Sequence, residues 1–399
     1  MSTTDTAAAI RSFQIAIPAE QIDDLRRRIA ATRWPTRELV ADRSQGVQLA
    51  PLRELARYWA TEYDWRKCEA KLNALPQFTT MIDGLDVHFI HVKSAHANAL
   101  PLIMTHGWPG SIIELLETID PLTDPTAHGG RAEDAFHLVL PSIPGYGFSD
   151  QPTELGWGPI RIGQAWDELM RRLGYARYVA QGGDVGSQVT DAMGRLGLDG
   201  LIGIHTNLLT PALGDAEALS ASPPTKEEQA ALDALATFRE SGIGYFIEQA
   251  TRPETIGYAL LDSPIALAAW MIDHDTDSYQ KIARVFGDGQ PSGNLTREHI
   301  VDNIMLYWLT GTGASAARSY WEEGQETARA AAHAATPVSI PVGFTTFPGE
   351  IWRTPRSWVE RAYPNTIYFN EVDKGGHFAA WEEPDLFATE LRASFRALR

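Results

Sequence analysis

The chain has 399 residues, 44% of them hydrophobic and 21% charged, and a formal net charge of −17 at pH 7. This composition is typical of a soluble globular protein with one large domain or two ordinary ones, and the negative charge argues against nucleic acid or an anionic membrane as the main partner. The single cysteine, Cys68, excludes an internal disulfide. The first residues, MSTTDTAAAIRSFQ, lack the basic and apolar regions of a signal peptide, and no apolar run reaches about eighteen residues. We therefore expect no membrane span and a cytoplasmic location.

The N-terminal part of the chain is mostly helical in pattern. In IPAEQIDDLRRRIAATRW, apolar residues recur three to five positions apart, and Pro18 stands near the helix start, where proline is tolerated. A second segment with helical spacing, APLRELARYWATEYDWRKCEAKLNAL, follows after a loop. These segments predict an N-terminal extension over residues 1–77.

From residue 78 onward, short apolar runs alternate with turns and helices. FTTMIDGLDVHFIHVKS predicts two strands around an Asp83-Gly84 turn. LPLIMTHG, FHLVLPSIPG and YVAQGG each end in a glycine-containing loop, and the amphipathic segment GPIRIGQAWDELMRRLG lies between the second and the third. This alternation predicts an α/β fold with a mostly parallel central sheet, in which ligands bind beyond the carboxyl ends of the strands.

A long helical insertion divides this pattern. LIGIHTNLL, residues 201–209, is one more predicted strand, and the segments after it are helical and rich in aromatic residues. Strands resume with IPVGFTTFPGE and NTIYFNEVDKGGH, before the C-terminal helix EPDLFATELRASFRAL. We therefore predict a core in two parts, residues 78–210 and 337–399, separated by a helical lid over residues 211–336.

The pentad Gly182–Gly186 matches the pattern of a nucleophile on a sharp strand-to-helix turn, with Asp184 where hydrolases of this type commonly have serine. Small neighbours permit the strained turn, and the positive end of the following helix keeps a carboxylate ionised. The alternative is that Asp184 only caps the helix. Ser187 is a weaker candidate nucleophile, because it falls inside the helix.

A nucleophile at this turn requires an acid and a histidine later in the chain, each after a strand. Glu350 follows the first strand of the second half, and His377 lies in a glycine loop after the next strand. The order Asp184, Glu350, His377 predicts a nucleophile, an acid and a general base. Asp373 is an alternative acid, expected to lie still within the strand.

The loop THGWPG, residues 105–110, follows the first long buried strand. In this topology such a loop supplies one amide of the oxyanion hole, and the residue after the nucleophile supplies the other. We therefore assign the backbone N–H groups of Trp108 and Val185 to that role. His106 is expected to hold the loop by a structural hydrogen bond, and the sequence does not decide whether the peptide before Pro109 is cis.

A carboxylate nucleophile attacks saturated carbon and forms an alkyl ester with the enzyme. His377, held by Glu350, then removes a proton from the water that attacks the ester carbonyl, and the oxyanion hole serves this second step. The predicted reaction therefore opens a carbon–oxygen or carbon–halogen bond by displacement. No metal or organic cofactor is predicted, because ligand-type spacings of histidines and carboxylates are absent.

With these residues in place, the chain resembles the epoxide hydrolases of the α/β-hydrolase fold, in the microsomal-type branch with an N-terminal extension. The similar blocks span nearly the whole chain: FQIAIPAEQIDDLRRRIAATRWP, HGWPGS, PSIPGYGFS, GGDVGS, DSPIALAAW and GGHFAAWEEP. The resemblance implies two tyrosines that donate hydrogen bonds to the epoxide oxygen, at Tyr245 and Tyr320, with Tyr258 and Tyr307 as alternatives. It also implies that the extension wraps the catalytic domain, and by analogy it admits a homodimer.

No hydrophobic anchor precedes Phe13, so the chain is similar to the soluble, microbial-like members. The expected reaction converts an apolar epoxide and water to a vicinal diol, because the insertion is rich in aromatic and aliphatic residues. A dehalogenase would use the same machinery, but enzymes of that kind commonly have tryptophan where this chain has Val185. A non-catalytic ligand receptor and an ester hydrolase acting through Ser187 are the remaining alternatives.

Overall fold

The computed structural model describes residues 9–329 and 336–399. The first eight residues lie outside the described part of the chain. They belong to the N-terminal segment in which the sequence predicts no signal peptide. Residues 330–335, at the end of the predicted lid, also lie outside the described part.

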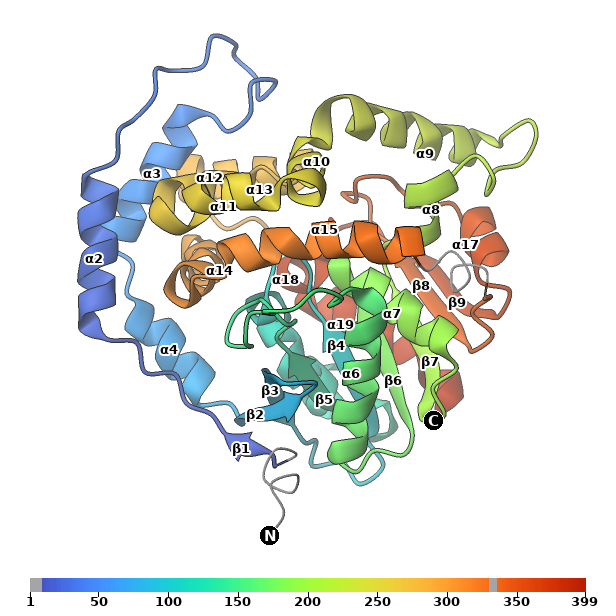
Figure 1. The fold of residues 1–399 in the computed structure, drawn as a ribbon. Coiled ribbons are helices and arrows are strands. Elements are labelled where there is room, and N and C mark those ends of the chain that lie inside the picture. Colours follow the sequence, from blue (N-terminus) through green and yellow to red (C-terminus); the bar gives the residue numbers. More distant parts are fainter. Residues whose placement is uncertain (1–8, 330–335) are drawn as a thin grey trace.

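A twisted sheet occupies the centre of the described structure (Figure 1). Its strands follow the order β1-β2-β3-β5-β4-β6-β7-β8-β9. Neighbours from β5 through to β9 are parallel, whereas β1, β2, β3 and β5 pair antiparallel. The predicted mostly parallel sheet is thereby confirmed. The strands are β1 (Arg11–Ser12), β2 (Gln77–Ile82), β3 (Leu85–Val92), β4 (Leu100–Thr105), β5 (Phe136–Pro141), β6 (Tyr178–Gly182), β7 (Leu201–Thr206), β8 (Val342–Thr346) and β9 (Thr366–Glu371).

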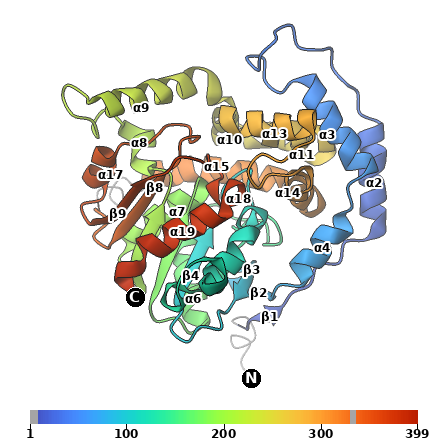
Figure 2. The ribbon, with the colours of Figure 1, turned by 180° about the vertical axis from the view of Figure 1, so that it is seen from behind.

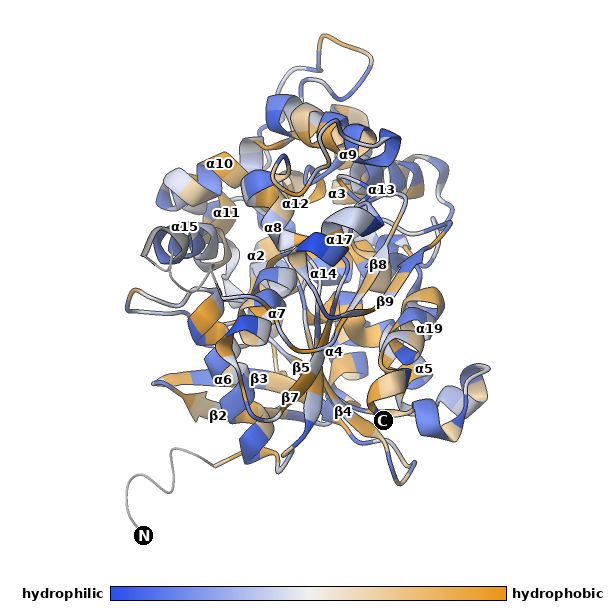
Figure 3. Cartoon of the chain, turned by 90° about the vertical axis from the view of Figure 1, so that its right-hand side faces the viewer, coloured by the Kyte–Doolittle hydropathy of each residue, from blue (hydrophilic) through white to orange (hydrophobic). Residues whose placement is uncertain are grey.

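The strand sequences explain this arrangement. The central strands are apolar along most of their length (Figure 3), as expected for strands that are covered on both faces. The predicted hairpin is present, with Ile82 paired to Leu85. Asp83 and Gly84 both have positive φ, at 50° and 84°, which suits the tight turn that joins two twisted strands.

Helices cover the two faces of the sheet. On one face lie α6 (Pro159–Arg172) and α7 (Val185–Leu196), which pack against each other, and α7 also packs on β6 and β7. On the other face α19 (Pro384–Ser394) packs on β8 and β9 (Figure 2). The short helices α5 (Ile119–Thr123) and α18 (Ala379–Glu382) accompany α19, and α17 (Arg356–Ala362) adjoins β9.

The N-terminal helices lie at one side of the molecule (Figure 1). They are α2 (Ala19–Ala30), α3 (Leu49–Thr61) and α4 (Trp65–Asn73). The second predicted helical segment is thus divided in two. Asp64 interrupts it, because its backbone is extended and its side chain accepts a hydrogen bond from the Arg66 amide, which caps α4.

A group of helices lies beyond one end of the strands and packs against α2, α3 and α4 (Figure 1). The division of the chain at residues 77, 210 and 336 stays a prediction. In the part of the chain that the structure describes, none of the helices has the length and apolar character needed to cross a membrane. The group consists of α8 (Thr210–Asp215), α9 (Lys226–Thr237), α10 (Gly244–Thr251), α11 (Pro253–Asp262), α12 (Pro264–Ile272), α13 (Thr276–Asp288), α14 (Arg297–Thr310) and α15 (Gly313–Arg329).

Candidate active site

The turn between β6 and α7 holds Asp184 in a strained conformation. Its φ of 50° and ψ of −125° are rare for any residue other than glycine and cost about 1–3 kcal/mol. Close backbone approaches explain the neighbouring glycines. A Cβ on Gly186 would lie 2.1 Å from the carbonyl oxygen of Thr105, and one on Gly182 would lie 2.0 Å from that of Gly186. Backbone packing therefore requires glycine at these two positions, independently of the chemistry of Asp184.

The Asp184 carboxylate does not cap α7, so the capping alternative is wrong. Its Oδ1 accepts a hydrogen bond from the Trp108 amide at 2.7 Å, and its Oδ2 lies 3.2 Å from Nε2 of His377. Burial raises the pKa of Asp184, but the hydrogen bond and charge of His377, the charge of His274 and the Trp108 amide outweigh it and lower the pKa. The side chain is a buried, ionised carboxylate.

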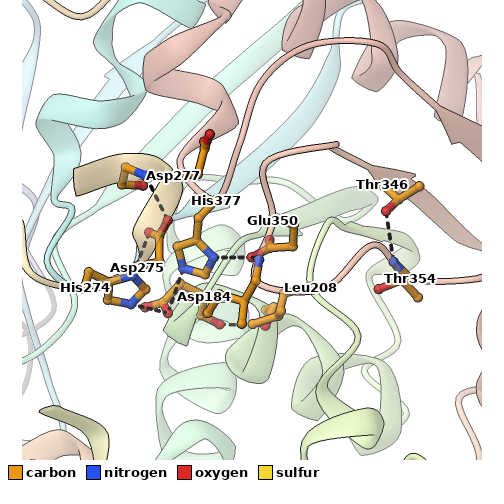
Figure 4. Close-up of polar contacts among 12 residues, drawn as sticks. Asp184, Leu208, His274, Asp275, Asp277, Thr346, Glu350, Thr354 and His377 are labelled. Atoms are coloured by element: carbon orange, nitrogen blue, oxygen red, sulfur yellow. Dashed lines mark hydrogen bonds and ion pairs between the residues drawn. The ribbon is translucent and has the colours of Figure 1, made fainter. Parts of the chain in front are cut away.

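His377 lies between Glu350 and Asp184 (Figure 4). Its Nδ1 is 2.5 Å from Oε1 of Glu350, which also accepts a hydrogen bond from the Ile351 amide at 2.8 Å. Burial opposes the charged imidazolium, yet Glu350 and Asp184 raise the pKa of His377 well above its usual value. The structure thus brings together the three side chains whose order along the chain predicted a triad.

Two alternative residues are placed elsewhere. Asp373 was expected within the strand, but β9 ends at Glu371, so Asp373 is an exposed loop residue. The chain leaves the sheet there to form the glycine loop that carries His377. Ser187 lies inside α7, and its hydroxyl donates to the Asp184 carbonyl at 2.6 Å.

The loop after β4 carries Trp108 beside Asp184, and the Trp108–Pro109 peptide is cis. As expected, His106 holds this loop, since Ile143 N–H donates to its Nε2 at 3.1 Å. Burial lowers the pKa of His106 to about 4, so the ring is neutral. Val185, the other predicted oxyanion donor, is buried at the first position of α7, and its role stays a prediction.

The two predicted tyrosines meet over Trp108. Tyr245 comes from α10 and Tyr320 from α15, with ring centroids 5.3 Å and 6.0 Å from that of Trp108. Burial, followed by the charge of Asp184, raises both pKa values well above 10, so both phenols are neutral. The alternatives do not fit: Tyr258 is 79% exposed, and Tyr307 donates to the Gly110 carbonyl at 2.6 Å.

A second histidine adjoins the triad and was not predicted. His274 Nε2 lies 3.8 Å from Asp184 Oδ2 and 2.8 Å from the Tyr245 hydroxyl, and its Nδ1 lies 3.1 Å from Asp275. Its ring lies against that of His377, with centroids 4.6 Å apart. His274 occupies the turn between α12 and α13. A histidine in a polar turn between helices gives no pattern for its role, although the adjacent His-Asp pair was a visible feature.

Within the described residues, Asp184, His274 and His377 offer ligand atoms within 4.8 Å of one another, as a metal site would require. The ring nitrogens that face Asp184 are engaged with that carboxylate and with Tyr245. A metal ion would have to displace these contacts. The expectation of no cofactor stays a prediction.

A cavity of about 20 Å³ borders Asp184 and His377, with Glu114, Gln181 and Asn207 among its lining residues. That volume is enough for one water molecule. Glu114 was not predicted as part of the site. Burial, together with the nearby Asp184 charge, raises its pKa to about 8, so its side chain is mostly protonated at neutral pH.

A second cavity of about 20 Å³ lies between His274 and Phe378. Its other walls come mainly from apolar side chains of α12, α13 and α14, among them Met271, Ile282 and Ile304. This second cavity is more apolar than the first.

An acidic residue at a tight strand-to-helix turn, with a histidine and a second acid on later strand-end loops, defines this protein as an α/β hydrolase. Residues 10–115 match the family described as epoxide hydrolase N terminus. A protein of Stigmatella aurantiaca (strain DW4/3-1) with a provisional epoxide hydrolase designation is 51% identical, over 98% of this chain and 86% of its own length. Epoxide hydrolase 1 of Sus scrofa is 37% identical, over 96% of this chain and 88% of its own.

Two solved structures are similar over nearly the whole chain. Juvenile hormone epoxide hydrolase from the silkworm Bombyx mori has a TM-score of 0.86 at 29% identity, with 99% of this chain and 97% of that chain covered. Aspergillus niger epoxide hydrolase has a TM-score of 0.82 at 32% identity, with 98% and 97% covered. This chain therefore belongs to the epoxide hydrolase family and is an enzyme of the α/β-hydrolase fold, which confirms the predicted resemblance.

Proposed function

We propose that this enzyme converts an apolar epoxide and water to a vicinal diol through a covalent ester on Asp184. The observation that carries the proposal is the position of the Asp184 carboxylate. It is buried and ionised, with His377 at 3.2 Å and the Trp108 amide at 2.7 Å. The rings of Tyr245 and Tyr320, from the helical side, lie against that of Trp108.

In the first step, a carboxylate oxygen of Asp184 attacks a ring carbon, and the bond from that carbon to the epoxide oxygen breaks. The oxygen leaves as an alkoxide and accepts a proton from a phenol of the tyrosine pair. Tyr320 can direct its O–H to that oxygen because, among the residues that the structure describes, nothing is hydrogen-bonded to its buried hydroxyl. A donor held close to the developing charge lowers the barrier by general acid catalysis.

In the second step, water attacks the carbonyl carbon of the ester while His377 takes one of its protons. The water-sized cavity beside Asp184 and His377 supports this assignment. The amides of Trp108 and Val185 stabilise the oxyanion. The bond between the carbonyl carbon and the diol oxygen then breaks, and the diol oxygen receives the proton from His377. Asp184 is left as a carboxylic acid, and its proton replaces the one that the tyrosine pair gave to the alkoxide. Glu350 supports the transient imidazolium through its contact with Nδ1.

The apolar walls of the second cavity support a substrate with an apolar substituent. The helices from α8 to α15 form the lid that carries the tyrosines, and the N-terminal extension braces that lid through its packing on α12, α13 and α14. The names of the related proteins also point to epoxides.

A single turnover in water labelled with ¹⁸O tests the covalent route. With enzyme in excess over styrene oxide, the ester mechanism leaves the first diol unlabelled, because its new oxygen comes from Asp184, and the label enters the peptide that contains Asp184. Direct attack of water on the epoxide would instead label the diol and leave the peptide unlabelled. Many turnovers on the same enzyme provide the control, because labelled Asp184 then passes its oxygen on to the diol.

A further inference from the structure

The two phenols of the site differ in what they contact. The hydroxyl of Tyr320 has no partner among the described residues, whereas that of Tyr245 lies 2.8 Å from His274 Nε2. His274 in turn contacts the Asp275 carboxylate through Nδ1 at 3.1 Å. Tyr245, His274 and Asp275 thus form a second chain of polar contacts beside the triad (Figure 4 shows His274 and Asp275 next to Asp184).

The donors and acceptors along this chain follow from the charge of Asp275. Burial raises the pKa of Asp275, but its contacts with His274 and the Ser278 amide outweigh burial and lower it. Asp275 is therefore a carboxylate, and Nδ1 of His274 carries the proton between them. The state of Nε2 then decides what Tyr245 can do. An unprotonated Nε2 accepts a hydrogen bond from the Tyr245 hydroxyl, so that hydroxyl cannot donate to the substrate. A protonated Nε2 donates to the phenol oxygen, and the phenol O–H is free.

We propose that His274 is a positioning residue that controls Tyr245, so that Tyr245 donates to the epoxide oxygen only when His274 is an imidazolium. This inference rests on the proposed function. As the ring opens, Tyr245 passes its proton to the alkoxide and receives the Nε2 proton of His274. The imidazolium becomes neutral, and the phenol is restored.

The groups around His274 allow this proton to return. Two carboxylates lie beside its ring nitrogens: Asp184, from the strand-end turn, at 3.8 Å, and Asp275, at the start of α13, at 3.1 Å. His377 and Tyr245 are titratable side chains whose rings also lie against it. Esterification removes the charge of Asp184, which favours release of the His274 proton. Hydrolysis then leaves Asp184 as a carboxylic acid, whose proton returns to His274 Nε2 from an oxygen that is 3.8 Å away in the resting enzyme.

The experiment follows ester formation in the His377→Gln variant, which removes the titration of His377 and blocks hydrolysis. Styrene oxide is added across about pH 5 to about pH 8, the range in which histidine titrates, and the rate of adduct formation on Asp184 is measured by mass spectrometry. We expect the rate to fall about tenfold per pH unit once His274 loses its proton. It should then level at the rate of the variant that also carries Tyr245→Phe.

Further substitutions in the same background separate this role from a structural one. His274→Gln places an amide N–H that can donate to the Tyr245 oxygen at every pH. The fall in rate with rising pH, the falling limb, should therefore disappear. Tyr320→Phe is the matched control, since that hydroxyl does not contact His274; it should slow ester formation but keep the limb. Asp275→Asn retains a helix-capping side chain but removes the carboxylate that accepts from His274 Nδ1, so the position of the limb should change.

Two results would overturn the inference alone: ester formation that is independent of pH, or a falling limb that persists unchanged in both the His274→Gln and Asp275→Asn variants. A complete lack of adduct in the His377→Gln parent would contradict the proposed function, and the inference would fall with it.

Discussion

The sheet side and the helical side of the site are built in different ways. On the sheet side, Asp184, Glu350 and His377 each lie just beyond the end of a parallel strand. On the helical side, Tyr245 and Tyr320 come from two separate helices, and His274 comes from the turn between two others. The sheet therefore fixes one set of groups through strand pairing, whereas helix packing alone sets the distance of the other set from the nucleophile.

The largest expected effect is on the sheet side. Asp184→Ala should abolish turnover of styrene oxide, because no other carboxylate at the turn can form the ester. Binding of the substrate should persist, since the apolar walls are unchanged. Diol formation followed by chromatography measures the first property, and quenching of tryptophan fluorescence measures the second. Residual turnover in purified variant, insensitive to further purification, would place the nucleophile elsewhere.

The helical side should matter mainly for ring opening. Replacing both Tyr245 and Tyr320 by phenylalanine should slow ester formation by about 10³-fold, within the range of general acid catalysis, and far more than either single replacement. Stopped-flow measurement of a single turnover separates this step from hydrolysis. A double variant that opens styrene oxide at the rate of the unsubstituted enzyme would remove the phenols from the mechanism.

Glu350→Gln should affect the second step and leave the first nearly unchanged. We expect hydrolysis to slow by about 10²-fold, because the imidazolium formed at His377 loses its carboxylate partner. Glu350 raises the pKa of His377, so its removal lowers that pKa, and the acidic limb of the hydrolysis rate should move to lower pH. An unchanged limb would show that Glu350 does not act through His377.

The smallest effect concerns two histidines buried in the sheet. Their pKa values are lowered, whereas that of His377 is raised. Burial lowers the pKa values of His88 and His205 to about 3. Below about pH 6.5 the unfolded chain binds protons that the folded protein does not, so stability falls as the pH drops, by about 1.4 kcal/mol per unit for each histidine. In His205→Gln, urea unfolding between about pH 6 and about pH 4 should show a pH slope reduced by that amount. An equal slope in both proteins would contradict the assignment.

The difference between the two sides also explains what could be predicted from the sequence. The strands, the tight turn and the loops after β8 and β9 appear as apolar runs ending in glycine-rich segments, and their order along the chain was enough to name Asp184, Glu350 and His377. The choice between Glu350 and Asp373 depended on where a strand ends, and there the expectation for Asp373 was wrong by a few residues.

The helical side gave no such pattern. Tyr245 and Tyr320 were named only through the resemblance to a family, since helical spacing does not tell which face a tyrosine occupies. His274 and Glu114 were missed for the same physical reason: both reach the site through packing between distant segments, and neither follows a strand. That Tyr245 is bound to His274 while Tyr320 is unpartnered could be seen only in the folded structure.

The central claim is that Asp184 is a covalent nucleophile, and the His377→Gln variant tests it most directly. The variant is mixed with excess styrene oxide and digested, and the peptide that contains Asp184 is examined by mass spectrometry. We predict a gain of one substrate mass on that peptide, because ring opening proceeds while hydrolysis is blocked. An unmodified peptide, from a variant whose unsubstituted parent turns over styrene oxide, would contradict the account.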